Sequence, residues 1–325
     1  MKKLMVLASA LAAAVFSTSA AKADVSVSGS YGFHAITGKD VLSGASASDT
    51  DATTSGTLFM QGGGVSFAMS TTTAGGMTVS ASAGITLDSN DADNSTSATG
   101  LSAVTFAADG FSLTAGEIDI PAGGGTGEVG FVASAVVDNG GYSQSGIATG
   151  LANTEGYGFI ASTSVGAASV SFGYMLDYAN SGVNNAETQA GDYASGISVS
   201  LPMGASTVTL GTASQSGSKD ESTVGIAASM PYGDYTVKVG YEATDESTDS
   251  SSMSAAISGS LDADTTWAVG YTDGEQGTSS STQTEAKLTR SLGGGVSVYA
   301  ELQNSSGTTT GTAGTNLAVG TTVAF

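Results

Sequence analysis

The chain has no cysteine, one histidine and three prolines among its 325 residues. Without cysteine it cannot form disulfides, thiolate nucleophiles or cysteine–zinc sites. Its single histidine, His34, cannot build a multi-histidine metal site, and no serine has a histidine or lysine base at a spacing that suggests nucleophilic catalysis. We therefore expect a protein that is not an enzyme and that holds neither a cofactor nor a metal site.

Basic residues are also scarce, since eight Lys and Arg stand against 29 Asp and Glu. Two lysines precede an apolar run over residues 4–16, and Ala21-Lys22-Ala23 matches a signal-peptidase site. We expect residues 1–23 to be an export signal and residues 24–325 to be one mature domain. Removing the signal takes away three basic residues and no acidic one, so the formal charge falls to −24. Such a charge repels phosphates and excludes nucleic acid as a partner.

Long hydrophobic runs are missing after the signal: none reaches 18 residues, so no transmembrane helix is expected. The apolar residues alternate with small and polar ones instead. In the last ten residues, one side of a strand carries Leu317, Val319, Thr321, Val323 and Phe325. The same period of two recurs along the mature chain, and no comparable helical period does, so the sequence predicts an all-β protein.

Turn signals divide the chain into strands of similar length. Seven short turns are expected at Thr73–Gly76, Asp109–Gly110, Val165–Ala168, Pro202–Ala205, Pro231–Asp234, Asp262–Asp264 and Gly293–Gly295. Eight longer polar segments lie between them, at Gly38–Ser55, Asp88–Ala98, Ile118–Glu155, Ala179–Gly191, Gln215–Glu221, Asp245–Ser252, Gly274–Ser281 and Ser305–Gly314. This spacing predicts about 16 antiparallel strands with short turns at one end and long loops at the other, which is typical of a transmembrane β-barrel.

The two faces of the expected strands favour such a barrel over a water-soluble sandwich. One face is apolar, and the other is Ser, Thr, Gly and Ala with an occasional charge, as in a wide, water-filled lumen. Aromatic residues cluster near strand ends on the apolar face and fit interfacial girdles. They are Tyr31, Phe33, Tyr157, Phe159, Tyr178, Tyr235, Tyr241, Trp267 and Tyr271.

Six segments resemble the alphaproteobacterial branch of the Gram-negative general-diffusion porins. They read VSVSGSYG, VSFAMSTTTAGGMTVSASAG, TFAADGFSLTAGEID, MPYGDYTVKVGYE, RSLGGGVSVYAE and NLAVGTTVAF, in order along the mature chain. The resemblance implies a trimer of 16-stranded barrels in the outer membrane, each with its third external loop folded inward. It also implies that Phe325 is an assembly signal read by the barrel assembly machinery, and that the partners are membrane lipid, lipopolysaccharide, small solutes and cations. Such porins usually oppose the acidic inward loop with a basic cluster, whereas this mature chain has only five basic residues.

The charged residues of the expected pore follow from the loop and from the period of two. The third and longest loop, with the residues beside it, carries Glu117, Asp119, Glu128 and Asp138, which we expect at a constriction that favours cations. Strand alternation predicts that Lys238, Glu242, Glu285, Lys287 and Glu301 face the lumen, where charges set selectivity.

Two short motifs within the expected loops match known binding-site patterns only in part. Gly125-Thr126-Gly127-Glu128-Val129-Gly130 matches G-x-G-x-x-G but lacks the strand and helix of a dinucleotide site. Asp88-Ser89-Asn90-Asp91-Ala92-Asp93 begins like a calcium loop but has no glycine at its sixth position. Both are interpreted as loop sequence.

The sequence therefore predicts an outer-membrane channel for passive diffusion of small hydrophilic solutes, with a preference for cations. One alternative is a substrate-specific channel built on the same barrel. The other, from a different class, is a secreted or surface-bound β-solenoid adhesin, which would show a repeat of near-constant length.

Overall fold

The structure is a computed structural model that describes residues 24–38, 56–88, 96–99, 103–121, 155–177, 193–216, 220–246, 248–307 and 314–325. The expected export signal over residues 1–23 lies outside these ranges. Strands account for nearly all of the described chain, as the period of two predicts. Within the described ranges, no helix is both long enough and apolar enough to span a membrane.

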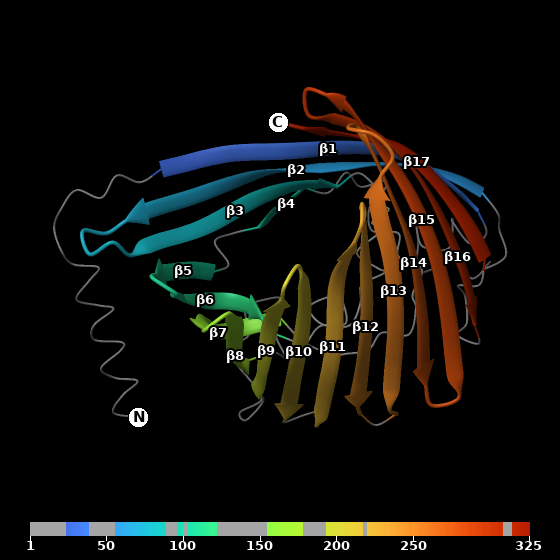
Figure 1. The fold of residues 1–325 in the computed structure, drawn as a ribbon. Coiled ribbons are helices and arrows are strands. Elements are labelled where there is room, and N and C mark those ends of the chain that lie inside the picture. Colours follow the sequence, from blue (N-terminus) through green and yellow to red (C-terminus); the bar gives the residue numbers. More distant parts are fainter. Residues whose placement is uncertain are drawn as a thin grey trace.

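Seventeen strand segments follow one another along the chain (Figure 1). They are β1 (Asp24–Gly38), β2 (Gly56–Thr72), β3 (Thr78–Asp88), β4 (Thr96–Thr99), β5 (Ala103–Ala108), β6 (Phe111–Asp119), β7 (Glu155–Val165), β8 (Ala168–Asp177), β9 (Tyr193–Met203), β10 (Ser206–Ser216), β11 (Glu221–Tyr232), β12 (Tyr235–Asp245), β13 (Ser250–Ser260), β14 (Thr265–Gln276), β15 (Ser279–Gly293), β16 (Val296–Gly307) and β17 (Gly314–Ala324).

These segments form one closed antiparallel barrel. Apart from β4 and β5, each segment pairs with its neighbours in the chain. Strand β1 pairs with both β2 and β17, so the first and last strands meet at a seam. The segments β4 and β5 both pair with β3, and therefore share one position in the sheet. The barrel thus has the 16 strand positions that the turn spacing predicts. Its single closed antiparallel sheet excludes the β-solenoid alternative.

The connections agree with the predicted short turns, and the largest difference lies in one predicted long loop. All seven predicted short turns join consecutive strands. The segment Gly274–Ser281, expected to be a long loop, is instead a two-residue turn, because β14 continues to Gln276 and β15 begins at Ser279, its paired residue. Gly277 has a φ of 58°, which lets the chain reverse within two residues. The polar residues on either side therefore extend two strands rather than forming a loop.

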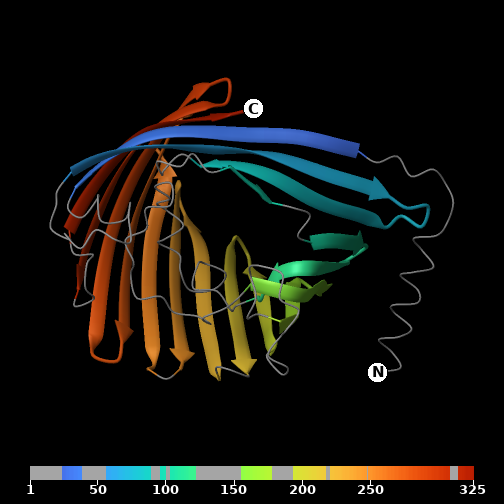
Figure 2. The same ribbon diagram turned by 180° about the vertical axis from the view of Figure 1, so that it is seen from behind.

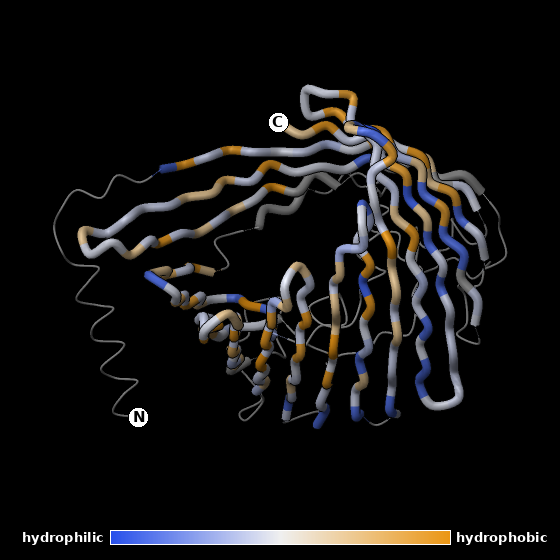
Figure 3. Tube along the Cα trace, viewed as in Figure 1, coloured by the Kyte–Doolittle hydropathy of each residue, from blue (hydrophilic) through white to orange (hydrophobic). Residues whose placement is uncertain are grey.

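Hydrophobic and hydrophilic residues alternate along the strands (Figure 3). The two faces of the sheet therefore differ in chemistry, as the period of two predicts. Large apolar side chains on the outward face are exposed, for example Tyr241 at 46%, Leu288 at 43% and Leu302 at 46%. The opposite face, which we call the lumen face, carries mostly small and polar residues, and many of these are buried. An exposed apolar belt around a closed sheet is what a lipid environment requires.

One edge of the outward belt is marked by aromatic and charged residues beside the short turns. The rings of Tyr235 and Trp267 meet edge to face, with centroids 5.8 Å apart. Nearby, Arg290 lies 3.7 Å from the carboxylate of Asp262 in the β13–β14 turn and donates a hydrogen bond to Thr265. The backbone N–H of Asp264 and the Thr265 hydroxyl hold the pKa of the Asp262 carboxyl below its usual range. This arrangement suits a membrane–water boundary. Tyr178, another predicted girdle residue, lies outside the described residues.

The seam between β1 and β17 includes the last residue of the chain. Phe325 and Gly29 exchange two backbone hydrogen bonds of 2.9 Å. The Phe325 ring covers Gly29 so closely that a Cβ at Gly29 would lie 2.6 Å from Cε2 of the ring. The chain end therefore completes the closure of the sheet, with its ring 70% exposed on the outward face.

We expect deletion of Phe325 to impair barrel formation, because it removes two seam hydrogen bonds worth about 1 kcal/mol each as well as the ring packed on Gly29. Refolding into lipid vesicles, followed by heat-modifiable migration on a denaturing gel, measures the folded fraction. Phe325→Leu keeps both backbone bonds and should fold better than the deletion. Equal folded fractions for the deletion and the parent chain would contradict this expectation.

Candidate functional site

The charged residues predicted to face the lumen do lie on that face. Lys238 and Glu242 alternate with the outward Val239 and Tyr241 on β12. On β15 and β16, Glu285, Lys287 and Glu301 alternate with Leu288 and Leu302 in the same way. Strand pairing therefore brings five predicted residues, from three strands, onto the wall of one lumen.

Lys287 and Glu301 form an ion pair across β15 and β16. They are directly paired residues, and the Lys287 Nζ lies 3.5 Å from an oxygen of Glu301. The Glu301 side chain is only 1% exposed, against 23% for that of Lys287. Lys287 also lies 5.1 Å from the centroid of the Tyr299 ring, within reach of a cation–π interaction. The only lysine on this part of the described wall is thus partly neutralised by its neighbour.

Glu285 occupies the next lumen position on β15, and two amides hold it. Gln283 and Gln303 both donate hydrogen bonds to its Oε1, the second at 3.3 Å. Glu285 is 2% exposed. Gln303 is the residue directly opposite on β16. The period of two predicted the face of Glu285, but the glutamines that orient it became evident only from the register of β15 against β16.

The two charges on β12 differ in their surroundings. Lys238 is exposed and lies four residues nearer the short turns than Glu242, which is 1% exposed. On the neighbouring β11, Glu221 also faces the lumen and accepts a hydrogen bond of 2.5 Å from Gln215. Sequence reasoning missed Glu221 because it was assigned to a loop, whereas β11 begins at that residue.

The acidic residues predicted at the start of the third loop do not lie on the lumen face. Ile118 is 5% exposed and packs in a lumen cluster with Ile120, so the alternate residues Glu117 and Asp119 belong to the opposite face of β6. Pairing agrees, because Glu117 lies opposite Tyr157, which is 59% exposed. The expectation that Glu117 and Asp119 project into the constriction from β6 is therefore wrong: the strand extends one residue past Ile118 and keeps its alternation.

Glu128 and Asp138, the other two acidic residues predicted at the constriction, lie outside the described residues. The described part of that loop consists of Ile120 and Pro121, directly after β6. Ile120 is fully buried against the lumen faces of β8, β9 and β10, together with Met175, Ala194 and Ala213. The chain therefore turns into the lumen where the third loop begins.

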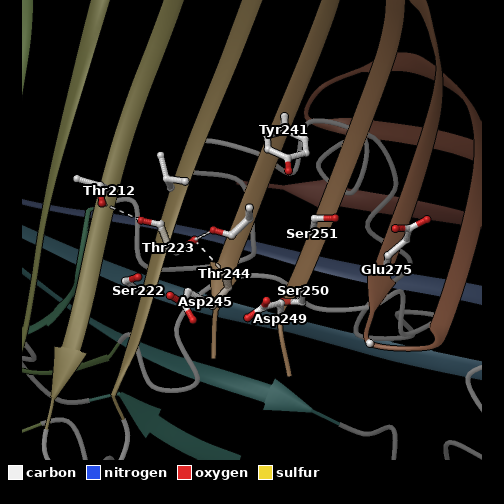
Figure 4. Close-up of a pocket in the computed structure, with 13 residues that line it drawn as sticks. Thr212, Ser222, Thr223, Tyr241, Thr244, Asp245, Asp249, Ser250, Ser251 and Glu275 are labelled. Atoms are coloured by element: carbon white, nitrogen blue, oxygen red, sulfur yellow. Dashed lines mark hydrogen bonds between the residues drawn. The ribbon is translucent and has the colours of Figure 1, made fainter. Parts of the chain in front are cut away.

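A separate pocket lies at the long-loop end of β10 to β14 (Figure 4). Its volume is about 740 Å³, and its lining includes the apolar Val224 and Tyr241 and the carboxylates Asp245, Asp249 and Glu275. Threonine hydroxyls tie the strands together here, because Thr244 donates a 3.2 Å hydrogen bond to Thr223. The pocket belongs to the acidic rim of the barrel rather than to the lumen wall.

The buried ion pair leads to a stability prediction. Lys287→Met should lower the free energy of unfolding by about 1–3 kcal/mol, since it removes the cation that faces the buried Glu301. Denaturant titration of the vesicle-embedded barrel measures this loss. Lys238→Met makes the same charge change at an exposed lumen position and should cost less, and adding Glu301→Gln to Lys287→Met should recover part of the loss. Equal losses for the two lysine variants would contradict a role for the pair.

Comparisons with known proteins agree with this geometry. The family model described as Gram-negative porin matches residues 9–310. No curated protein matches the chain by sequence. A loop-deletion mutant of OmpT, an outer membrane protein of Vibrio cholerae, covers 93% of this chain and 99% of its own at 13% identity, with a TM-score of 0.67.

Two further solved structures have the same fold. An anion-selective porin from Comamonas acidovorans covers 94% of this chain and 100% of its own at 14% identity, with a TM-score of 0.67. A mutant of the Rh. blastica porin covers 93% and 100% at 17% identity, with a TM-score of 0.62. With the closed barrel and a family match over most of its length, this chain belongs to the Gram-negative porin family, whose members form channels in the outer membrane.

Proposed function

We propose that this porin is exported through residues 1–23 and lets small hydrophilic solutes and ions diffuse passively, with cations passing faster than anions. Family membership and the closed barrel support the channel itself. The polar lumen face supports passage of hydrophilic solutes, because it offers hydrogen-bonding groups and few apolar side chains to a hydrated path.

The observation that carries the cation preference is the shortage of basic side chains in the lumen. The mature chain has five basic residues: Lys39, Lys219, Lys238, Lys287 and Arg290. Lys39 and Lys219 lie outside the described residues, and Arg290 lies beside a short turn on the outward face.

Only Lys238 and Lys287 therefore face the lumen in the described strands, and Lys287 is paired with Glu301. Against them stand Glu221, Glu242 and Glu285 on the same wall. An excess of carboxylates in a low-dielectric enclosure raises the local concentration of cations. The anion-selective porin from Comamonas acidovorans shares the fold at 14% identity, a likeness that carries no information on the selectivity of this chain.

We also propose that the protein works as a homotrimer in contact with lipid and lipopolysaccharide, and that the barrel assembly machinery recognises Phe325. One similar structure is described as the trimer form of OmpT, at 14% identity and a TM-score of 0.62. Native gels of the unheated protein and conductance steps in groups of three would support the trimer, whereas a monomeric sedimentation mass in detergent would contradict it.

A salt gradient across a planar bilayer tests the cation preference. In dilute KCl the zero-current potential should have the sign of a cation-selective pore. Selectivity should fade near 1 M salt, because the Debye length falls to about 3 Å and screens the wall charges. A potential of the opposite sign in dilute KCl would refute the proposed preference while leaving the channel itself intact.

The contribution of the third loop can be separated from that of the wall. We propose that Glu128 and Asp138 lie at the constriction, so that Glu128→Gln with Asp138→Asn should shift the zero-current potential toward zero. Glu117→Gln with Asp119→Asn is a matched control, because it removes the same number of negative charges from the outward face of β6. Equal shifts for both pairs would indicate a field from the whole acidic rim rather than from the constriction.

A further inference from the structure

Four strands place an unusual row of residues on the lumen face. Ile160, Gly173, Gly196 and Ala213 are directly paired with one another in that order, across β7, β8, β9 and β10. Two adjacent positions thus carry no side chain, and the third carries only a methyl group. With strands about 4.8 Å apart, this row leaves a shallow trough roughly 10 Å wide between larger side chains. We call Gly173, Gly196, Ala194 and Ala213 the glycine trough.

The trough is filled by the first two residues after β6. A Cβ at Gly173 would overlap Cδ of Pro121 and lie 3.4 Å from Cδ1 of Ile120. A Cβ at Gly196 would overlap the carbonyl oxygen of Pro121 and lie 2.6 Å from Cγ2 of Ile120. Ile120 has no exposed surface. Ile120 and Pro121 therefore fit closely against both Gly173 and Gly196.

Space explains these glycines better than backbone geometry does. Neither Gly173 nor Gly196 has a positive φ, unlike Gly166 and Gly204 in the adjacent turns, which have φ values of 63° and 68°. Glycine in the interior of a strand weakens the sheet and often marks the close approach of another segment of backbone. At both glycines the backbone that comes close is that of the chain after β6, at Pro121.

The occupant is apolar, although the lumen face around it is mostly polar. Ile118 and Ile120 contact Met175, Ala194 and Ala213, and Ile160 packs against the edge of this cluster. Contact with the trough removes apolar surface from the water that fills a porin lumen. The start of the third loop is therefore held to the wall by packing, directly where β6 ends.

We propose that the glycine trough is the dock that positions the third loop in the lumen, with Gly173 and Gly196 as positioning residues for the constriction. This inference rests on the proposed role of that loop in the channel. A side chain added in the trough would displace Ile120 and Pro121 from the wall and so weaken the attachment of the third loop where it begins.

Cross-linking tests the dock without reference to channel activity. Because the chain has no cysteine, Ile120→Cys with Ala213→Cys introduces the only two thiols. Mild oxidation of the folded barrel should form the disulfide, which thiol labelling and migration on a non-reducing gel detect. The matched control is Ile120→Cys with Ala256→Cys, another buried alanine of the lumen face three strands away. Absence of the cross-link, or equal cross-linking in the control, would overturn the proposal.

A double-variant comparison tests the consequence for the pore. Gly173→Ala should raise the unit conductance by tens of per cent, and adding Pro121→Ala should restore it, because the overlapping Cδ is then absent. Gly196→Ala should also raise the conductance, but Pro121→Ala should not restore it, because the overlapping atom there is a backbone oxygen. Gly84→Ala on β3 is the control, since the one atom within 4 Å of a Cβ placed there, the Val65 carbonyl oxygen of β2, lies at an ordinary contact distance of 3.6 Å.

The outcomes separate this inference from the proposed function. Heat-modifiable migration first establishes that each variant folds, and a variant that does not fold leaves the cross-link as the deciding measurement. A channel that forms normally without the cross-link between positions 120 and 213, or without any change in Gly173→Ala, refutes the dock alone. A cross-linked barrel that conducts no ions refutes the proposed function and leaves the dock in place.

Discussion

A peptide group in hydrocarbon has no water to bond with, and the architecture of this porin depends on that constraint. Only a closed sheet pairs every backbone N–H and C=O along strands that cross a membrane. The seam between β1 and β17 is therefore as important as any hairpin, although it joins the first and last strands of the described chain. Phe325 bonds to Gly29 at this seam and so takes part in closing the barrel. Figure 2 shows the C-terminal end of the chain beside the blue strand β1.

Closure also explains why the outward face and the lumen face carry different kinds of side chain. The large apolar side chains of the outward face are exposed because no protein core covers them. The lumen face does not have to be apolar, and it carries the buried carboxylates of the described strands. Glu301 and Lys287 show how such charges are accommodated on a wall: each is placed by strand pairing, and the pair neutralises part of the field that a lone residue would create.

The lumen face has a second use, which is to hold a segment of its own chain. At Gly173 and Gly196 the wall has no side chains, and Ile120 with Pro121 occupies the space. The same face thus carries a packed apolar contact on β8 to β10 and, beyond the four intervening strands, a hydrogen-bonded acidic patch on β15 and β16. The apolar contact and the acidic patch are therefore carried by different strands of one barrel.

The sequence alone determined the barrel, the number of its strand positions and the face on which Lys238, Glu242, Glu285, Lys287 and Glu301 lie, because a period of two and the turn residues are local properties. It could not determine that Gly274–Ser281 is a tight turn, that Glu117 and Asp119 lie on the outward side of β6, or that Glu221 belongs to the wall, since each depends on where a strand ends. The pairing of Lys287 with Glu301 and the row from Ile160 to Ala213 depend on register. Register joins residues far apart in the chain, so only the tertiary structure decided which of them meet.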